Sequence, residues 1–468
     1  MKNTKLMVLV ALLSMLSFGC QDDLDDAIRP ANALELNDFI WKAMNIFYLN
    51  KSEVPDLADN RFNTVEDYTT YLETFLTPEA LFDNLITTND RFSIIVSDFR
   101  KLEDALNGVR LDNGMRFGLV QLNNSNDVFG YVRYVLPNSP AANAGVERGM
   151  LFNKVNAVRL SEDTDFSSLF SGSNYSISLA ELNESNLQDT NQEIALEKIQ
   201  LTEQAIHKTE IFENSSSTVA YLMYNGFRSG QENQLNAVFG NFAAQGVNEL
   251  VLDLRYNSGG DLRTSVDLAS MITGQFASEL FATQEYNANF ENEIINFTTQ
   301  NRNGGSLNSL NLSRVFILTS PSTASASEMV ISGLLPYINV VQIGTSTVGK
   351  YQASTTLYDS DNYRRQNASL AHTYALQPLI SKLKNANNYT DFDEGIPPSI
   401  SLNEDFNNLG ELGTTSEPLL KKALEEIGFV LDRPLVLENT ISTNTHLILD
   451  DAFMDLDYQN MYIEFPSY

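Results

Sequence analysis

The chain has 468 residues and a formal net charge of −30 at pH 7, since 60 aspartates and glutamates outnumber 30 lysines and arginines. A chain of this length predicts two or three domains rather than one small core. The charge argues against nucleic acid as a partner and against a basic patch that binds anionic lipid.

The N-terminus has the pattern of a secretory leader. Lys2 and Lys5 precede an apolar run, residues 6–16, that is too short to span a bilayer, and Cys20 follows a glycine. This pattern resembles a bacterial lipoprotein signal, in which residues 1–19 are removed and the cysteine is lipidated. A plain secretory signal is the alternative.

Cys20 is the only cysteine, so a lipidated chain has no thiol left for a disulfide, a metal site or cysteine catalysis. The acidic run at 21–26 predicts a solvated tether over residues 20–33, and it resembles the surface-export signals of lipoproteins in Bacteroidetes-like bacteria. We therefore expect a cell-envelope protein held to the outer membrane by its lipid anchor only. Periplasmic and surface-exposed placement both stay open.

Residues 34–112 predict a helical N-terminal domain. Apolar residues recur at helical spacing over 39–47 and again over 65–75, and Pro78 begins a further helix. We expect this all-α unit to pack on the rest of the chain.

Residues 113–203 predict short strands and turns. An alternating strand, a short helix after Ser-Pro and a returning strand follow in order, at residues 130–135, 139–145 and 148–156. The order resembles a PDZ domain, in which loop N–H groups hold a C-terminal carboxylate while the peptide adds a strand. The resemblance places the peptide-binding residues at Phe117, Gly118 and Leu119. A small β-domain without a ligand is the alternative.

Strands and helices alternate over residues 204–433. The predicted elements are a strand at 219–222, a helix at 231–242, a strand at 250–254, a helix at 262–272, a strand at 315–318, a helix at 325–335 and a strand at 340–343. Alternation of this kind predicts an α/β core with a largely parallel sheet, whose sites lie at the carboxyl ends of the strands. Residues 434–468 predict only an extended, partly ordered tail.

Four residues at three such strand ends are candidates for catalysis. Ser325 stands at the start of a helix, whose unpaired N–H groups favour an anion. Lys350 follows the next strand, and it can deprotonate a serine only if apolar surroundings lower its pKa from ~10.4. Gly259 and Gly260 end another strand, where backbone N–H groups can approach a ligand closely. The alternative is structural, because Ser325-x-x-Glu328 is also a capping box.

The combination of three motifs carries a resemblance to a known family. DLRYNSGG, STASASE and GTSTVGK, at residues 253–260, 322–328 and 344–350, resemble the C-terminal processing, or tail-specific, serine peptidases. The resemblance implies a core similar to the ClpP/crotonase fold, with Ser325 as nucleophile and Lys350 as general base. It also implies that N–H groups of Gly259, Gly260 and Ala326 form the oxyanion hole.

One position departs from the family pattern. Many members carry a glutamine four residues after the lysine, where it orients the amine, whereas this chain has Ser354 there. The nearest glutamine is Gln352, so either Gln352 or another group takes that role.

The sequence thus predicts a serine endopeptidase that cleaves extended or C-terminally exposed polypeptides through an acyl-enzyme. The alternative from another class is a non-catalytic peptide- or ligand-binding surface lipoprotein on the same scaffold. A polypeptide is the expected partner, and no metal, nucleotide or other cofactor is implied. His207, His372 and His446 fit neither a metal site nor a Ser-His-Asp pattern, and the oligomeric state stays open.

Overall fold

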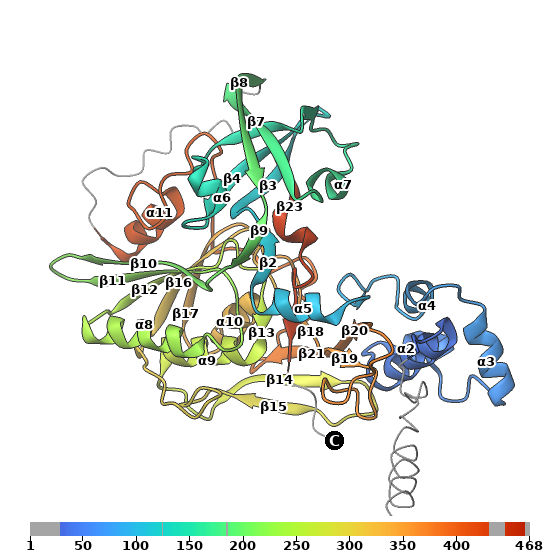
Figure 1. Cartoon of the computed structure of the whole chain (residues 1–468). Coiled ribbons are helices and arrows are strands. Elements are labelled where there is room, and N and C mark those ends of the chain that lie inside the picture. The colour runs from blue at the N-terminus through green and yellow to red at the C-terminus, as the bar shows by residue number, and fades with distance from the viewer. Residues whose placement is uncertain (1–28, 124, 184–185, 430–444, 464–468) are drawn as a thin grey trace, which may run out of the picture.

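The computed structural model describes residues 29–123, 125–183, 186–429 and 445–463. The leader, Cys20 and the acidic run therefore lie outside the described residues. Three units are visible in Figure 1: a helical unit at the N-terminal end, a β-rich unit and an α/β core. Within the described ranges, no helix has both the length and the apolar character that a membrane crossing requires.

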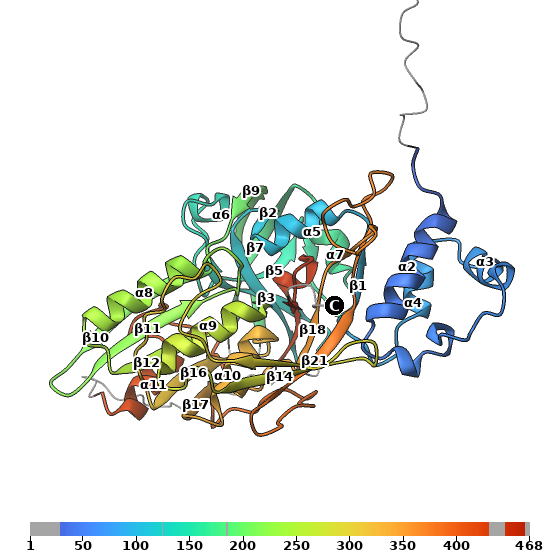
Figure 2. The ribbon, with the colours of Figure 1, turned by 90° about the horizontal axis from the view of Figure 1, so that it is seen from below.

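The helical unit consists of three α-helices and two short 3₁₀ turns. These are α2 (Ala33–Phe47), η2 (Lys51–Glu53), η3 (Pro55–Leu57), α3 (Val65–Glu73) and α4 (Pro78–Asn84). The side chains of Asn32, Thr64 and Thr77 cap the N-termini of the three helices, as their sequence positions favour. The buried face of α2 packs against Leu357 and Leu376 of the core, so the predicted helical unit is anchored there. Figures 1 and 2 both show it at the opposite end of the molecule from α8.

The β-rich unit follows two connecting elements, β1 (Ile94–Val96) and α5 (Phe99–Leu106). Its elements are β2 (Val109–Asp112), β3 (Met115–Leu122), β4 (Val128–Val135), α6 (Pro140–Asn143), β5 (Leu151–Val155), β6 (Val158–Arg159), α7 (Phe166–Phe170), β7 (Asn174–Asn183), β8 (Asn186–Glu197) and β9 (Ile199–Thr202). Strands β3, β4, β5, β7 and β8 form an antiparallel sheet in that order, whereas β2 pairs with β9. The predicted strands at 130–135 and 148–156 are confirmed as β4 and β5.

The α/β core is built on a six-stranded sheet in the order β10-β11-β12-β16-β17-β22. Its elements are β10 (Ile206–Glu213), β11 (Thr218–Tyr224), α8 (Glu232–Ala244), β12 (Glu249–Asp253), α9 (Leu262–Thr273), β16 (Arg314–Thr319), α10 (Ala326–Leu334), β17 (Asn339–Gly344), β22 (Ile400–Ser401) and α11 (Pro418–Ile427). Strands β11, β12, β16, β17 and β22 are parallel, which confirms the predicted sheet. Apolar side chains of α8, α9 and α10 cover one face, and those of α11 cover the other.

A second sheet of the core receives a strand from the far end of the sequence. The remaining elements are β13 (Gly260–Asp261), β14 (Leu280–Tyr286), β15 (Glu293–Asn296), β18 (Gln352–Ser354), β19 (Leu357–Tyr358), β20 (Ala375–Gln377), β21 (Leu379–Asn385), β23 (Thr445–Asp450), η4 (Asp451–Met454) and β24 (Met461–Tyr462). The sheet order is β13-β24-β18-β21-β14-β15, while β23 pairs with β3 of the β-rich unit. In Figure 1 this red segment runs from the β-rich unit down into the core. Residues 445–463, here called the returning segment, are thus part of two sheets.

Candidate active site

Ser325 occupies the turn between β16 and α10. Its backbone has φ 65°, a value that non-glycine residues adopt rarely and that is concentrated at functional sites. The side chain is fully buried, and its Oγ has no hydrogen-bond partner among the described residues. A buried hydroxyl without a full hydrogen bond costs free energy. Ser325 and Glu328 also have the arrangement of a capping box at the start of α10, so the structural role considered for this pair is present as well.

The carboxylate of Glu328 joins the two candidate catalytic residues. One oxygen, Oε2, accepts the backbone N–H of Ser325 at 2.6 Å and that of Lys350 at 2.9 Å. The other, Oε1, accepts the N–H of Gly349 at 2.7 Å and the hydroxyl of Thr347 at 2.5 Å. Burial raises the pKa of Glu328, against the effect of these donors. The capping arm predicted for Glu328 is therefore present, and it also draws the chain at Lys350 beside the start of α10.

Lys350 is buried, with 1% of its surface exposed. Its Nζ donates to the carbonyl oxygen of Gln459 at 2.7 Å and lies 4.7 Å from the ring centroid of Phe92. Burial lowers the pKa of Lys350 to about 7, although Asp90 and Glu328 act in the opposite direction. A neutral amine is therefore accessible near neutral pH, which is the condition for a lysine to act as a general base.

The paired glycines lie against the serine. Gly259 has φ 114°, and a Cβ at that position would be 2.8 Å from Ser325 Oγ. The N–H of Gly259 donates to Asn257 Oδ1 at 2.9 Å, and the N–H of Gly260 donates to the carbonyl of Asn460 at 2.7 Å. Ala326 is the first residue of α10, where N–H groups have no intrahelical acceptor. Two of the three predicted oxyanion donors are thus engaged by other groups in this structure.

The other predicted site residues lie elsewhere. Gln352 is in β18, its Oε1 has no hydrogen-bond partner among the described residues, and the Nζ of Lys350 bonds Gln459 instead. Phe117 and Leu119 point into the apolar core of the β-rich unit, while Gly118 of the same strand pairs with Asp450.

Motif reasoning missed three contributors to the site. Asp90 and Phe92 come from the end of the helical unit, and Gln459 comes from a part of the chain 109 residues beyond Lys350. None of them stands in a motif, so no local signal marks them. In the described ranges, no three His, Cys, Asp or Glu side chains form a group suited to hold a metal ion.

Comparison with known proteins identifies the family of the chain. Residues 218–400 match the family model "Peptidase family S41" and residues 35–94 match "Peptidase S41 N-terminal domain", which together are just over half of the chain. A CtpA-like serine protease of Staphylococcus epidermidis is 26% identical over 163 residues. That stretch is 35% of this chain and 31% of the relative, so the match spans under a third of the relative's length.

Two solved structures share the fold over most of the chain. An S41 protease from Bacteroides fragilis has 28% sequence identity and a TM-score of 0.62, and the match covers 84% of this chain and 97% of the other. The photosystem II D1 C-terminal processing protease has 18% identity and a TM-score of 0.52, with coverage of 83% and 97%, which shows a common fold alone. With both S41 models matched in order along the sequence, the chain belongs to peptidase family S41.

Proposed function

We propose that the chain is a serine endopeptidase that cleaves extended or C-terminally exposed polypeptides with a Ser325–Lys350 dyad. The observation that carries this proposal is that the backbone N–H groups of Ser325 and Lys350 donate to the same oxygen of Glu328. The Ser325 Oγ is buried without a hydrogen-bond partner among the described residues, and burial lowers the pKa of Lys350 to about 7. Membership of family S41 supports serine-type proteolysis independently.

The proposed reaction needs only groups of the protein, the substrate and water. Neutral Lys350 accepts the proton of Ser325 Oγ as the oxygen attacks the scissile carbonyl carbon. The N–H of Ala326 donates to the oxyanion of the tetrahedral intermediate, and the N–H of Gly260 becomes a second donor once a substrate has displaced the carbonyl of Asn460. Lys350 then protonates the leaving amine, the peptide C–N bond breaks, and an acyl-enzyme remains. Water, deprotonated by the same lysine, attacks the ester and releases Ser325.

We assign peptide presentation to the β-rich unit and membrane attachment to the N-terminal leader. A PDZ-like role of the β-rich unit would present a polypeptide by strand addition at β3, where Gly118 already pairs with a strand. Lipidation at Cys20 would hold the enzyme at the outer membrane of the cell envelope, as the leader pattern predicts.

The test is hydrolysis of an unstructured protein such as casein by the full chain. Ser325→Ala and Lys350→Ala should each lower the rate by at least about 10³-fold, as removal of dyad members does in serine peptidases. Ser332→Ala is the matched control, since Ser332 lies in the same helix α10 and its buried hydroxyl also has no hydrogen-bond partner within the described part of the chain. Cleavage that survives either dyad substitution at close to the natural rate would refute the assignment.

A further inference from the structure

The returning segment, residues 445–463, occupies the catalytic centre. Two successive carbonyl oxygens of this segment engage the site: Gln459 O accepts from Lys350 Nζ, and Asn460 O accepts from the N–H of Gly260, both at 2.7 Å. The next residues form β24, which lies between β13 and β18. An extended segment of the chain itself therefore accepts hydrogen bonds from the Nζ of Lys350 and the N–H of Gly260, which a polypeptide substrate would need.

The same segment also occupies the edge of the β-rich unit. Strand β23 pairs antiparallel with β3, and its Asp450 lies opposite Gly118. Strand addition of this kind is a common way for a domain to bind an extended peptide, because main-chain hydrogen bonds supply the affinity. One segment thus fills a strand position in each of two sheets, beside β3 and beside β13.

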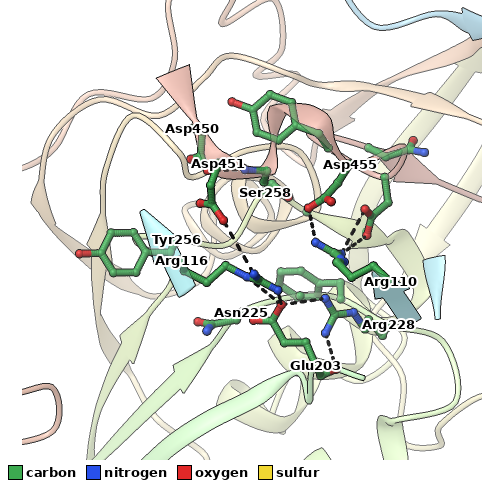
Figure 3. A pocket seen from close by; sticks show the side chains of 18 of the residues that line it. Arg110, Arg116, Glu203, Asn225, Arg228, Tyr256, Ser258, Asp450, Asp451 and Asp455 are labelled. Atoms are coloured by element: carbon green, nitrogen blue, oxygen red, sulfur yellow. Dashed lines mark hydrogen bonds and ion pairs between the residues drawn. The ribbon is translucent and has the colours of Figure 1, made fainter. Parts of the chain in front are cut away.

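Four aspartates of the segment lie against three arginines: one is the last residue of β23, and the other three lie between β23 and β24. Arg133 pairs with Asp450 at 2.6 Å, Arg116 lies 3.9 Å from Asp451, and Arg110 pairs with Asp457 at 3.2 Å and also with Asp455. Figure 3 shows Asp450, Asp451 and Asp455, which belong to the red segment, above Arg110 and Arg116. Such a cluster of buried cations stands out in a chain whose net charge is −30.

The arginines differ in the acidic partners that they would keep if the returning segment left the cleft. Arg116 keeps Asp112 at 2.7 Å and Glu203 at 2.9 Å, and Glu203 also lies 3.8 Å from Arg228. Arg110 has ion pairs only with Asp455 and Asp457 among the described residues.

Among the described residues, Arg133 would then hydrogen-bond only the hydroxyls of Tyr131 and Ser322. The ring of Tyr256 lies 4.9 Å from its guanidinium, and Glu404 is a further carboxylate that acts on it, without a direct ion pair.

The side chain of Arg133 is only 2% exposed and that of Arg110 only 13%. An acidic occupant of the cleft supplies the counter-charges that Asp450, Asp455 and Asp457 supply here, through charge-assisted contacts, which are among the stronger hydrogen bonds in proteins.

We propose that the cleft of this enzyme binds acidic polypeptide segments through Arg110 and Arg133, and that residues 445–463 are a tethered ligand that competes with substrate for those positions. The reaction performed on the bound polypeptide rests on the proposed function, whereas the binding preference does not. Arg110 and Arg133 are specificity-determining residues in this scheme, since they contact the ligand away from the reacting atoms.

The experiment measures binding rather than cleavage. The probe is a fluorescent synthetic peptide with the sequence of residues 445–463, and its matched partner carries Asn at the four aspartate positions. The protein is the full chain with Ser325→Ala, which prevents turnover, alone or with Asp455→Asn and Asp457→Asn to loosen the returning segment. We expect the loosened form to bind the acidic peptide about tenfold tighter, because a charge-assisted contact is worth that much or more.

Matched controls separate this effect from a general change in charge. Glu73→Gln with Asp83→Asn removes the same two charges from exposed positions of the helical unit and should leave affinity unchanged. In the loosened form the acidic peptide should bind at least about tenfold better than the Asn peptide, and Arg110→Gln should abolish that preference. Equal binding of the two peptides, or no gain from loosening the segment, would overturn the proposal.

A second measurement needs no substitution in the returning segment. Hydrogen exchange of the natural chain is followed by mass spectrometry with and without saturating acidic peptide. If the peptide displaces the returning segment, the amides of residues 445–463 should exchange faster, while those of β3 stay protected by the bound peptide. Unchanged exchange of both segments under saturating peptide would contradict the competition. A loosened chain, with Asp455→Asn and Asp457→Asn and with Ser325 intact, that binds acidic peptide but does not cleave casein would refute the proposed function alone. Cleavage without an acidic preference would refute this inference alone.

Discussion

Replacement of Lys350 by methionine should stabilise the protein in acid while it removes activity. In the folded state burial lowers the pKa of Lys350 from 10.5 to about 7, so between these values the unfolded chain binds more protons than the folded one. Stability of the natural protein therefore rises with pH across that window and is lowest below it. Methionine has a similar length and no charge, so it should remove the free-energy cost of keeping the amine of Lys350 buried.

The size of the pKa shift of Lys350 determines how much free energy of unfolding the substitution should add. At 1.36 kcal/mol per pKa unit, the penalty is about 5 kcal/mol at pH 6 and about 2 kcal/mol at pH 9. Loss of the hydrogen bond to Gln459 costs about 1 kcal/mol at either pH. We expect Lys350→Met to be more stable than the natural chain by up to about 4 kcal/mol at pH 6 and by about 1 kcal/mol at pH 9.

Urea unfolding at pH 6 and pH 9 measures this difference through the transition midpoints. Lys101→Met is the matched control, because Lys101 is exposed and forms no described ion pair; its effect should be the same at both pH values. A Lys350→Met variant that is less stable than the natural chain at pH 6, or that gains equally at both pH values, would refute the reasoning that burial lowers the pKa of this lysine.

Three further predictions follow from the same site. For the natural enzyme, kcat/KM on a casein-derived peptide should rise with pH through about 7 and then level off, because the base must be neutral; a rate that falls over this range would exclude Lys350 as the base. Gly259→Ala should lower kcat/KM on the order of 10²-fold, since the new Cβ would lie 2.8 Å from Ser325 Oγ. Gly246→Ala controls for backbone strain, as Gly246 also has positive φ but open space around it, and equal losses in both variants would contradict the steric argument. Glu328→Gln should destabilise the chain by about 2–4 kcal/mol and lower activity at least about tenfold, because an amide can satisfy fewer of the four donors that face this carboxylate. Thermal melting measures the loss of stability, and kcat/KM measures the loss of activity. An unchanged melting temperature would rule out this structural role of Glu328.

Local sequence patterns determined much of the architecture. The seven elements predicted between residues 219 and 343 all occur, each with ends within two residues of those expected. They were predictable because buried parallel strands are short apolar runs and their helices have apolar residues at helical spacing. The three motifs likewise identified Ser325, Lys350 and Gly259, which the fold does bring together at the carboxyl ends of strands.

Contacts between distant parts of the chain were decided only by tertiary structure. Gln459 and Asn460 reach the site through β24, and no pattern around them predicts a strand that pairs with Gly260. A two-residue strand carries too little periodicity to be recognised, and its pairing depends on edges that exist only after the core has folded. Hydrophobic period and turn chemistry are local properties that sequence alone determines, whereas burial of Lys350 and its lowered pKa depend on which remote segments cover it.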